Sequence, residues 1–323
     1  MIHLHFNLLL VQFLADHREI WLTRLFLAAS YLGSASFYFF FTILLYVVWD
    51  KRRAVHLTVL VLLAMSLNDL LKIFIANPRP FIQDGTYLKK WAVSPANAKV
   101  LAAEYSTPSG HAMGSSAFYA YFFALVRNRF VRVAFVLAIF LIGASRPYLG
   151  VHYVEDVLLG WAIGLLVALT ATRFAGPIAN LWQKCSHGSQ IALTVAACLA
   201  FWLLVVALNH GRIDGQVREM TADLGFLTGI VIAFPLELRF IDFDPRSSTA
   251  GAKILRYALT IALMVVVLFG LRAAFGPLAG NFSILGCALE YLCYAAVDVA
   301  GMFLAPLIFC KLNLAETKRW AHA

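Results

Sequence analysis

Charged side chains are scarce in this sequence. Asp, Glu, Lys and Arg together make up only 13% of the 323 residues, about half of the ~25% that soluble proteins carry. The apolar set, with alanine, tyrosine and cysteine included, makes up 62%, and the mean hydropathy is +0.79. This composition excludes an ordinary soluble domain as well as disordered and collagen-like chains. Because backbone groups in lipid must be satisfied within the chain, it predicts an all-α, polytopic bundle of membrane-spanning helices.

Acidic residues are fewer than basic ones, with 17 Asp and Glu against 26 Lys and Arg, a net charge of +9. The basic residues are scattered through short segments between apolar runs, and no long basic tract occurs. We therefore expect no nucleic-acid partner. We expect anionic lipid instead, either as membrane headgroups or as a substrate. No Lys or Arg precedes Arg18, so we also expect no signal peptide.

Cysteine spacing gives no metal or disulfide pattern. None of the five cysteines forms a CxxC pair, and four lie in or at the end of apolar runs: Cys185, Cys198, Cys287, Cys293 and Cys310. We interpret them as core residues and expect neither a disulfide framework nor a structural metal.

Apolar runs long enough to cross a membrane need about 20 residues. By this rule the chain has about nine helices, at residues 21–48, 55–75, 110–126, 131–145, 153–172, 190–208, 224–240, 255–276 and 283–310. The run at 131–145 is short by the same rule. Residues 4–14 are too short to span and predict an interfacial helix, with a cramped extra span as the alternative.

These helices group into five predicted regions. They are an N-terminal interfacial helix (1–20), a core of five spans (21–174), a cytoplasmic linker (175–189), an annex of four spans (190–310) and a cytoplasmic tail (311–323). Basic residues concentrate on one side, as at Lys51-Arg52-Arg53, and the positive-inside rule makes that side cytoplasmic. Residues 76–109, 146–152 and 209–223 are then extracytoplasmic.

Three polar clusters lie at the extracytoplasmic ends of core helices. The clusters are Lys72 with Arg79-Pro80, Pro108-Ser109-Gly110-His111, and Ser145-Arg146 with His152 and Asp156. Three cations in them suit phosphate, and an arginine fork matches phosphate oxygens in bidentate fashion. Ser109-Gly110-His111 opens a helix whose free N–H groups and positive dipole end favour an anion.

The two histidines suit covalent phosphoryl transfer. His152 and Asp156 are one helical turn apart, so the carboxylate can accept from one imidazole nitrogen and leave the other as a nucleophile. His111 is then available as a general acid for a leaving alcohol. We expect Asn68 and Asp69, one turn before Lys72, to position its ammonium group.

The three clusters resemble the tripartite signature of the type 2 phosphatidic acid phosphatase superfamily, over roughly residues 25–170. The resemblance implies that His152 forms a phosphohistidine, that Asp156 orients it and that His111 protonates the leaving group. It assigns phosphate binding to these residues: Lys72, Arg79, Ser109, Gly110 and Arg146. The family's phosphatases need no metal, so we expect no metal and no cofactor. The annex inherits no meaning from the resemblance.

The predicted activity is that of an integral membrane phosphatase acting on a lipid phosphate or pyrophosphate. We expect it in a bacterial cytoplasmic (inner) membrane, with the site facing the periplasm or the exterior. A lipid phosphotransferase, which passes the phosphoryl group to an acceptor alcohol, is one alternative. A non-catalytic lipid transporter or scaffold is the other.

Outside the signature, the sequence predicts several packing features. Glu290, Tyr294 and Asp298 share a stripe with Gly301 and Ala305 on the last helix, and acids inside a span normally face protein. We expect this stripe to pack on other helices or to form a homo-oligomer face, with a wall of the substrate cavity as the alternative, and we expect Arg272 to pair with Glu290. The GxxxG pair Gly160 and Gly164 predicts close packing within the bundle. Residues 95–104 are expected to form a short helix over the site, preceded by Lys89, Lys90 and Trp91.

Overall fold

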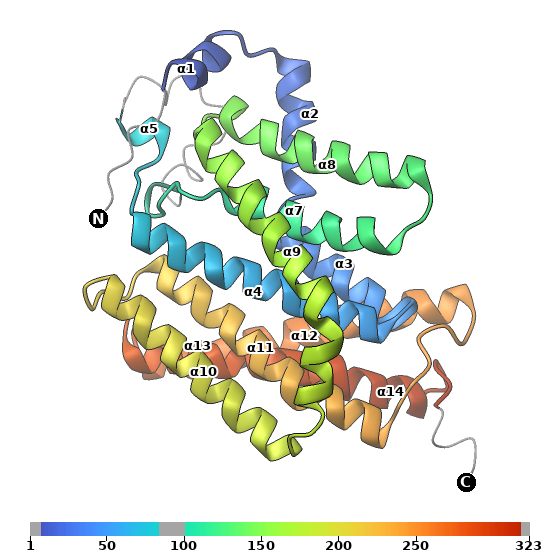
Figure 1. Cartoon of the computed structure of the whole chain (residues 1–323). Helices are drawn as coiled ribbons and strands as arrows, with labels where there is room; N and C mark the ends of the chain where they lie inside the picture. The colour runs from blue at the N-terminus through green and yellow to red at the C-terminus, as the bar shows by residue number, and fades with distance from the viewer. Residues whose placement is uncertain (1–7, 84–100, 318–323) are drawn as a thin grey trace. The chain divides into compact units, whose positions relative to one another are not determined.

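The computed structural model describes residues 8–83 and 101–317, and these consist of α-helices joined by short segments (Figure 1). The helices are α1 (Leu9–Asp16), α2 (Ile20–Tyr31), α3 (Ala35–Val48), α4 (Lys51–Ile75), α5 (Pro80–Gln83), α7 (Gly110–Leu125), α8 (Arg129–Tyr148), α9 (Val154–Trp182), α10 (His187–Leu208), α11 (Gly215–Phe240), α12 (Ala250–Phe275), α13 (Ile284–Val299) and α14 (Ala305–Lys311). A π-helix at Ala300–Leu304 joins the last two. The expected helix at 95–104 and the Lys89-Lys90-Trp91 segment lie mostly or wholly outside the described residues.

Seven segments of the described chain are helical, long and apolar enough to cross a membrane. The bent pair α2 and α3 makes one further candidate span. The prediction of a polytopic helical membrane protein is therefore confirmed. The exact count of nine is not, because α7 has 16 residues and falls below the length that a full span needs. Helix α1, with eight residues, is too short to span.

The first predicted span, residues 21–48, is wrong as one straight helix. Helices α2 and α3 meet at an angle of 50°. The N–H groups of Leu32, Gly33 and Ser34 each donate to the carbonyl three residues earlier, which tightens the end of α2. The Ser34 hydroxyl then accepts from the N–H of Phe37 and caps α3. At Gly33 a Cβ would lie 2.4 Å from Ile142, so the bend also permits a close approach of helix α8.

Two predicted helix boundaries near Gly and Pro residues are also wrong. Helix α9 continues ten residues past its predicted end and contains Pro177, although a polar break was expected there. A proline removes only one intrahelical hydrogen bond, and membrane helices tolerate it. Helix α11 begins at Gly215 rather than 224, because the Asp214 carboxylate accepts from the N–H of Val217 and caps it.

The described helices form two compact units. One consists of Met1–Tyr38 and Leu63–Gly176 and contains all three polar clusters; the other consists of Phe39–Leu62 and Pro177–Ala323. The division differs from the predicted boundary after residue 174, because α3 and the first half of α4 pack with the C-terminal helices. For example, the Tyr46 hydroxyl donates to the Met302 carbonyl at 2.9 Å.

Within the first unit, α7 and α9 are in close contact at two glycines. A Cβ at Gly160 would lie 2.8 Å from the Ser109 carbonyl oxygen. A Cβ at Gly164 would lie 2.2 Å from the Met113 carbonyl oxygen. The predicted packing role of this GxxxG pair is confirmed. It holds the N-terminus of α7 beside the start of α9, where the second and third polar clusters lie.

Within the second unit, the predicted pairing of Arg272 and Glu290 is confirmed, with 2.6 Å between Nη2 and Oε1. Arg218 also contacts Glu290, at 3.0 Å from its other carboxylate oxygen. Glu290 and Asp298 are each only 7% exposed, so both acids face protein as expected. The five cysteines are free thiols, and four of them are buried.

Candidate active site

The signature residues come from four elements of the first unit and the segments next to them. Lys72 lies in the last turn of α4, and Arg79 directly precedes α5. Ser109 is the N-cap residue of α7. Gly110 and His111 are the first two residues of α7. Arg146 lies near the end of α8, His152 precedes α9, and Asp156 lies in the first turn of α9. All are buried except Gly110 and His111, which are partly exposed.

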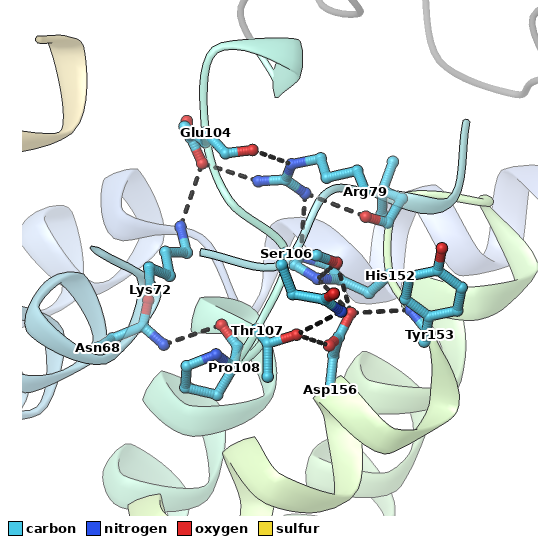
Figure 2. Close-up of polar contacts among 12 residues, drawn as sticks. Asn68, Lys72, Arg79, Glu104, Ser106, Thr107, Pro108, His152, Tyr153 and Asp156 are labelled. Atoms are coloured by element: carbon cyan, nitrogen blue, oxygen red, sulfur yellow. Dashed lines mark hydrogen bonds and ion pairs between the residues drawn. The ribbon is translucent and has the colours of Figure 1, made fainter. Parts of the chain in front are cut away.

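His152 and Asp156 form the pair that their spacing predicts (Figure 2). His152 Nδ1 lies 3.3 Å from Asp156 Oδ2. The carboxylate is fixed from three further directions: the hydroxyls of Ser106 and Thr107 donate to it at 2.5 Å each, and the Tyr153 N–H donates at 2.9 Å. A carboxylate held by this many donors keeps its position.

Arg79 defines the tautomer of His152. Its Nη1 lies 3.1 Å from His152 Nε2 and also donates to the Val151 carbonyl. A guanidinium is only a donor, so Nε2 must accept and the ring proton is on Nδ1, toward Asp156. Nε2 therefore carries its lone pair on the side of Arg79.

Glu104 joins two of the signature cations and was not predicted. Its Oε2 lies 3.1 Å from Lys72 Nζ and 2.8 Å from Arg79 Nη2. Its main-chain carbonyl also accepts from Arg79 Nε at 3.3 Å. Burial by itself raises the pKa of Glu104, but Lys72 and Arg79 outweigh burial and bring the pKa below its ordinary value. Glu104 is thus ionised at neutral pH.

The same cations act on the pKa of His152. Burial lowers this pKa, and the charges of Arg79, Arg146 and Lys72 lower it further, so that it lies well below the ordinary value of 6.5. The imidazole is therefore neutral at physiological pH, as a nucleophile must be. His111, in the first turn of α7, also interacts electrostatically with Arg146 and His152.

Two buried donors of the site lack a hydrogen-bond partner among the described residues. They are Arg146 Nε and the Ser109 hydroxyl. Arg146 Nη1 donates to Ser30 at 2.5 Å, and the Ser109 N–H donates to the Asp156 carbonyl at 3.0 Å. Buried unpaired donors are costly unless a ligand satisfies them. Their position beside three cations fits an anion with several oxygens.

Asn68 does not position Lys72 as expected. Its side-chain amide donates to the Pro108 carbonyl at 3.1 Å, and its Oδ1 would be 3.1 Å from a Cβ at Gly110. Asn68 thus fixes the segment that leads into α7. The described partner of the Lys72 ammonium is Glu104.

Sequence reasoning missed four contributors to the site: Ser30, Glu104, Ser106 and Thr107. Ser106 and Thr107 directly precede Pro108-Ser109, and this adjacency was the one available signal. Glu104 is a single acid in a polar segment, and no spacing rule distinguishes it. Ser30 lies in a predicted apolar span, where a serine normally bonds its own helix.

Two family models match this chain. A model of the PAP2 superfamily matches residues 53–179, which include the whole signature. A second model, described as PAP2 superfamily phosphatase, transmembrane extension, matches residues 221–317. Most of the predicted annex, which lies outside the signature, is therefore matched by a separate family model.

Two curated relatives and a solved structure are similar to part of this chain. Phosphatidylglycerophosphatase B of Bacillus subtilis is 29% identical over 179 residues, 52% of this chain and 82% of that protein. Undecaprenyl-diphosphatase of Sulfolobus acidocaldarius is 28% identical over 43% of this chain and 65% of its own. The crystal structure of Aquifex aeolicus LpxE is 26% identical over 52% of this chain and 94% of its own, with a TM-score of 0.43. The chain belongs to the PAP2 superfamily, as a membrane phosphatase that carries the transmembrane extension in its C-terminal part.

Proposed function

We propose that this protein hydrolyses a lipid phosphate monoester or diphosphate through a phosphohistidine at His152. The observation that carries the proposal is the orientation of that imidazole: Nδ1 faces the Asp156 carboxylate, and Nε2 accepts from Arg79. A phosphate held by Arg79 brings its phosphorus next to Nε2. The family's lipid phosphatases are metal-independent hydrolases, in keeping with a nucleophile supplied by the chain itself.

In the first step, Nε2 of His152 attacks phosphorus, the P–N bond forms and the bond to the lipid oxygen breaks. Burial and the neighbouring cations lower the pKa of His111 in the free site, and the negative charge of the bound phosphate raises this pKa again, so that His111 is protonated in the substrate complex. His111 donates this proton to the lipid oxygen, and the lipid leaves as an alcohol or as a phosphate monoester. In the second step, water attacks the phosphohistidine while His111 takes a proton from it. The P–N bond breaks, inorganic phosphate leaves, and both histidines return to their starting state.

Charge stabilisation in both steps comes from the cations and the start of α7. Negative charge spreads over the equatorial oxygens of the transition state. Lys72, Arg79 and Arg146 lie around that position, and the first-turn N–H groups of α7, from Gly110 onward, add the positive end of the helix dipole. Asp156 stabilises the imidazolium character that His152 acquires during attack.

We place the reaction on the extracytoplasmic side of a bacterial cytoplasmic membrane. Lys51-Arg52-Arg53 begins α4 and Lys72 lies in its last turn. The 21 residue steps from Lys51 to Lys72 correspond to about 32 Å of helix, close to the thickness of a bilayer core. The positive-inside rule assigns the Lys51 end to the cytoplasm, so the Lys72 end and the site lie outside.

The test is phosphate release by the purified protein in detergent, with no added alcohol. Five lipids are tested. Phosphatidylglycerophosphate and undecaprenyl pyrophosphate are chosen because the names of the two relatives refer to them, and phosphatidate, lipid A and a sphingoid-base phosphate are added. We expect release from at least one lipid, unchanged by EDTA. His152→Ala should fold normally and lose turnover. It should also lose the acid-labile phosphohistidine that the wild type forms with a radiolabelled substrate. A requirement for an added alcohol would favour the phosphotransferase, and normal activity of His152→Ala would refute the mechanism.

A further inference from the structure

The carboxylate of Glu104 lies between two cations that the proposed function assigns to the substrate phosphate. A single oxygen, Oε2, contacts both Lys72 Nζ, at 3.1 Å, and Arg79 Nη2, at 2.8 Å. These are the distances that a phosphate oxygen makes with ammonium and guanidinium groups. Figure 2 shows Glu104 above the histidine, with Lys72 and Arg79 both pointing toward it.

Glu104 also takes the edge of Arg79 that recognises phosphate. The carboxylate accepts from Nη2 and the main-chain carbonyl accepts from Nε, so both donors of that edge are engaged by one residue. The remaining nitrogen, Nη1, donates to Val151 and His152. An incoming phosphate dianion that uses this edge must replace Glu104, because a second anion on the same two cations is repelled.

The cations that contact Glu104 and the His152–Asp156 pair are more deeply buried than Glu104. The Glu104 side chain is 17% exposed, whereas the Arg79 side chain is 2% exposed and that of Asp156 is fully buried. Glu104 also lies on a turn, where its N–H donates to the Leu101 carbonyl, and not inside a long helix. Its side chain therefore has solvent on one side into which it can rotate when an anion arrives.

We propose that Glu104 is an internal competitor of the substrate phosphate, which lowers the affinity of the site for every phosphate ligand by the same factor. A lipid substrate still binds through the additional contacts of its apolar chains, whereas inorganic phosphate has no such contacts. Glu104 thus lowers the occupancy of the site by inorganic phosphate and speeds release of the phosphate product. This inference rests on the proposed function, since it takes Lys72 and Arg79 as the phosphate-binding pair.

The opposing hypothesis is that Glu104 positions Lys72 and Arg79 for substrate, and it predicts the opposite sign. If Glu104 competes with phosphate, its neutralisation strengthens anion binding; if it positions the cations, its neutralisation weakens anion binding. The two roles are separated by binding measurements that do not depend on turnover.

The experiment measures binding of inorganic phosphate and orthovanadate to the full-length protein in detergent. The variant is Glu104→Gln, and the matched control is Glu19→Gln, which removes the same charge from an exposed position of the same unit. We expect Glu104→Gln to bind both anions at least tenfold more tightly and Glu19→Gln to bind them as the wild type does. Affinity equal to or weaker than that of the wild type would overturn the proposal.

Two further measurements keep the outcome interpretable. If Glu104→Gln unfolds in detergent, Glu104→Asp is measured instead, because the aspartate carboxylate is one methylene farther from the cations. Glu104→Asp should also bind phosphate more tightly than the wild type does. Equal or weaker binding by Glu104→Asp would again refute the proposal. Where a variant turns over, the inhibition constant of inorganic phosphate should fall by the same factor as its dissociation constant, and an unchanged or higher inhibition constant would refute the proposal. If the wild type binds neither anion and releases no phosphate from any lipid, the proposed function itself fails, a result distinct from the failure of this inference.

Discussion

The contact between α7 and α9 at Gly164 gives a perturbation whose size follows from the structure. A Cβ there would lie 2.1 Å from the Ser116 hydroxyl oxygen and 2.2 Å from the Met113 carbonyl oxygen. The hydroxyl can rotate away, but the carbonyl belongs to the helix backbone. Gly164→Ala therefore forces the two helices about 1 Å apart, since carbon and oxygen need more than ~3 Å between them.

The expected loss of stability combines two opposing effects. Overpacking of a well-filled interface costs about 1–3 kcal/mol, and alanine regains up to about 1 kcal/mol of helix propensity over glycine. A net loss of about 1–2 kcal/mol follows. Activity should suffer more, because α7 carries His111 and α9 carries Asp156, and displacements of this size cost up to ~10²-fold in rate.

The control is Gly270→Ala inside α12, where no atom outside the helix's own neighbouring residues lies within 4 Å of the added Cβ. The two variants are compared by thermal unfolding in detergent, followed as loss of monodisperse protein, and by kcat for phosphate release. Gly270→Ala should match the wild type in both, and Gly164→Ala should melt lower and turn over at least tenfold more slowly. Equal behaviour of the two variants would refute the packing argument.

Four other predictions follow from the site and the extension. Because burial and the neighbouring cations lower the pKa of His152, its imidazole stays neutral below pH 6.5, so kcat/KM should fall on the acid side only below that pH in a pH–rate profile. His111→Ala should lose most activity on lipids with alcohol leaving groups but retain residual release from nitrophenyl phosphate. Arg146→Lys should lower kcat more than it raises KM, because an ammonium cannot replace a bidentate fork; normal turnover would refute that role. Glu290→Gln should lower the melting temperature in detergent and spare kcat, since two arginines lose their shared carboxylate.

The site residues that could be predicted from the sequence are of two kinds. Some are close neighbours in the chain, and the others lie at helix ends whose side of the membrane follows from the topology. His152 and Asp156 are four residues apart, and one helical turn makes them neighbours in any fold. Lys72, Ser109 and Arg146 lie at or near helix ends, and successive membrane helices alternate in direction, so these ends share one side. Spacing and topology are therefore enough to assemble the charged part of the site from the sequence alone.

The groups that hold this site together were not accessible in the same way. Glu104, Ser106 and Thr107 lie in a non-helical segment, whose path depends on contacts distant in sequence. Thr107 reaches Asp156 across 49 residues, and Glu104 reaches Lys72 across 32. The bend between α2 and α3 was not predicted for a similar reason. Leu-Gly-Ser is a short interruption in an apolar run, and its sequence does not reveal that helix α8 packs against Gly33.

In the C-terminal part of the chain, the predicted ion pair of Arg272 with Glu290 was right. The start of helix α11 was placed too late, because its first residues were assigned to a loop. An acid inside a span requires a cation, and Arg272 is close enough in sequence to provide it. Arg218 was assigned to an extracytoplasmic loop, although it lies in the first turn of α11, whose earlier start brings its guanidinium to Glu290.

Within the second unit, the extension contacts the start of helix α4. Lys51, at the start of α4, is 7% exposed, and its ammonium contacts Glu237 at 2.9 Å and Asp242 at 2.8 Å. Glu237 belongs to the extension and is fully buried. Removing one partner of such a buried pair strands the other charge, which costs about 3–5 kcal/mol. Within the second unit, this buried ion pair therefore fixes the start of α4 to the end of α11.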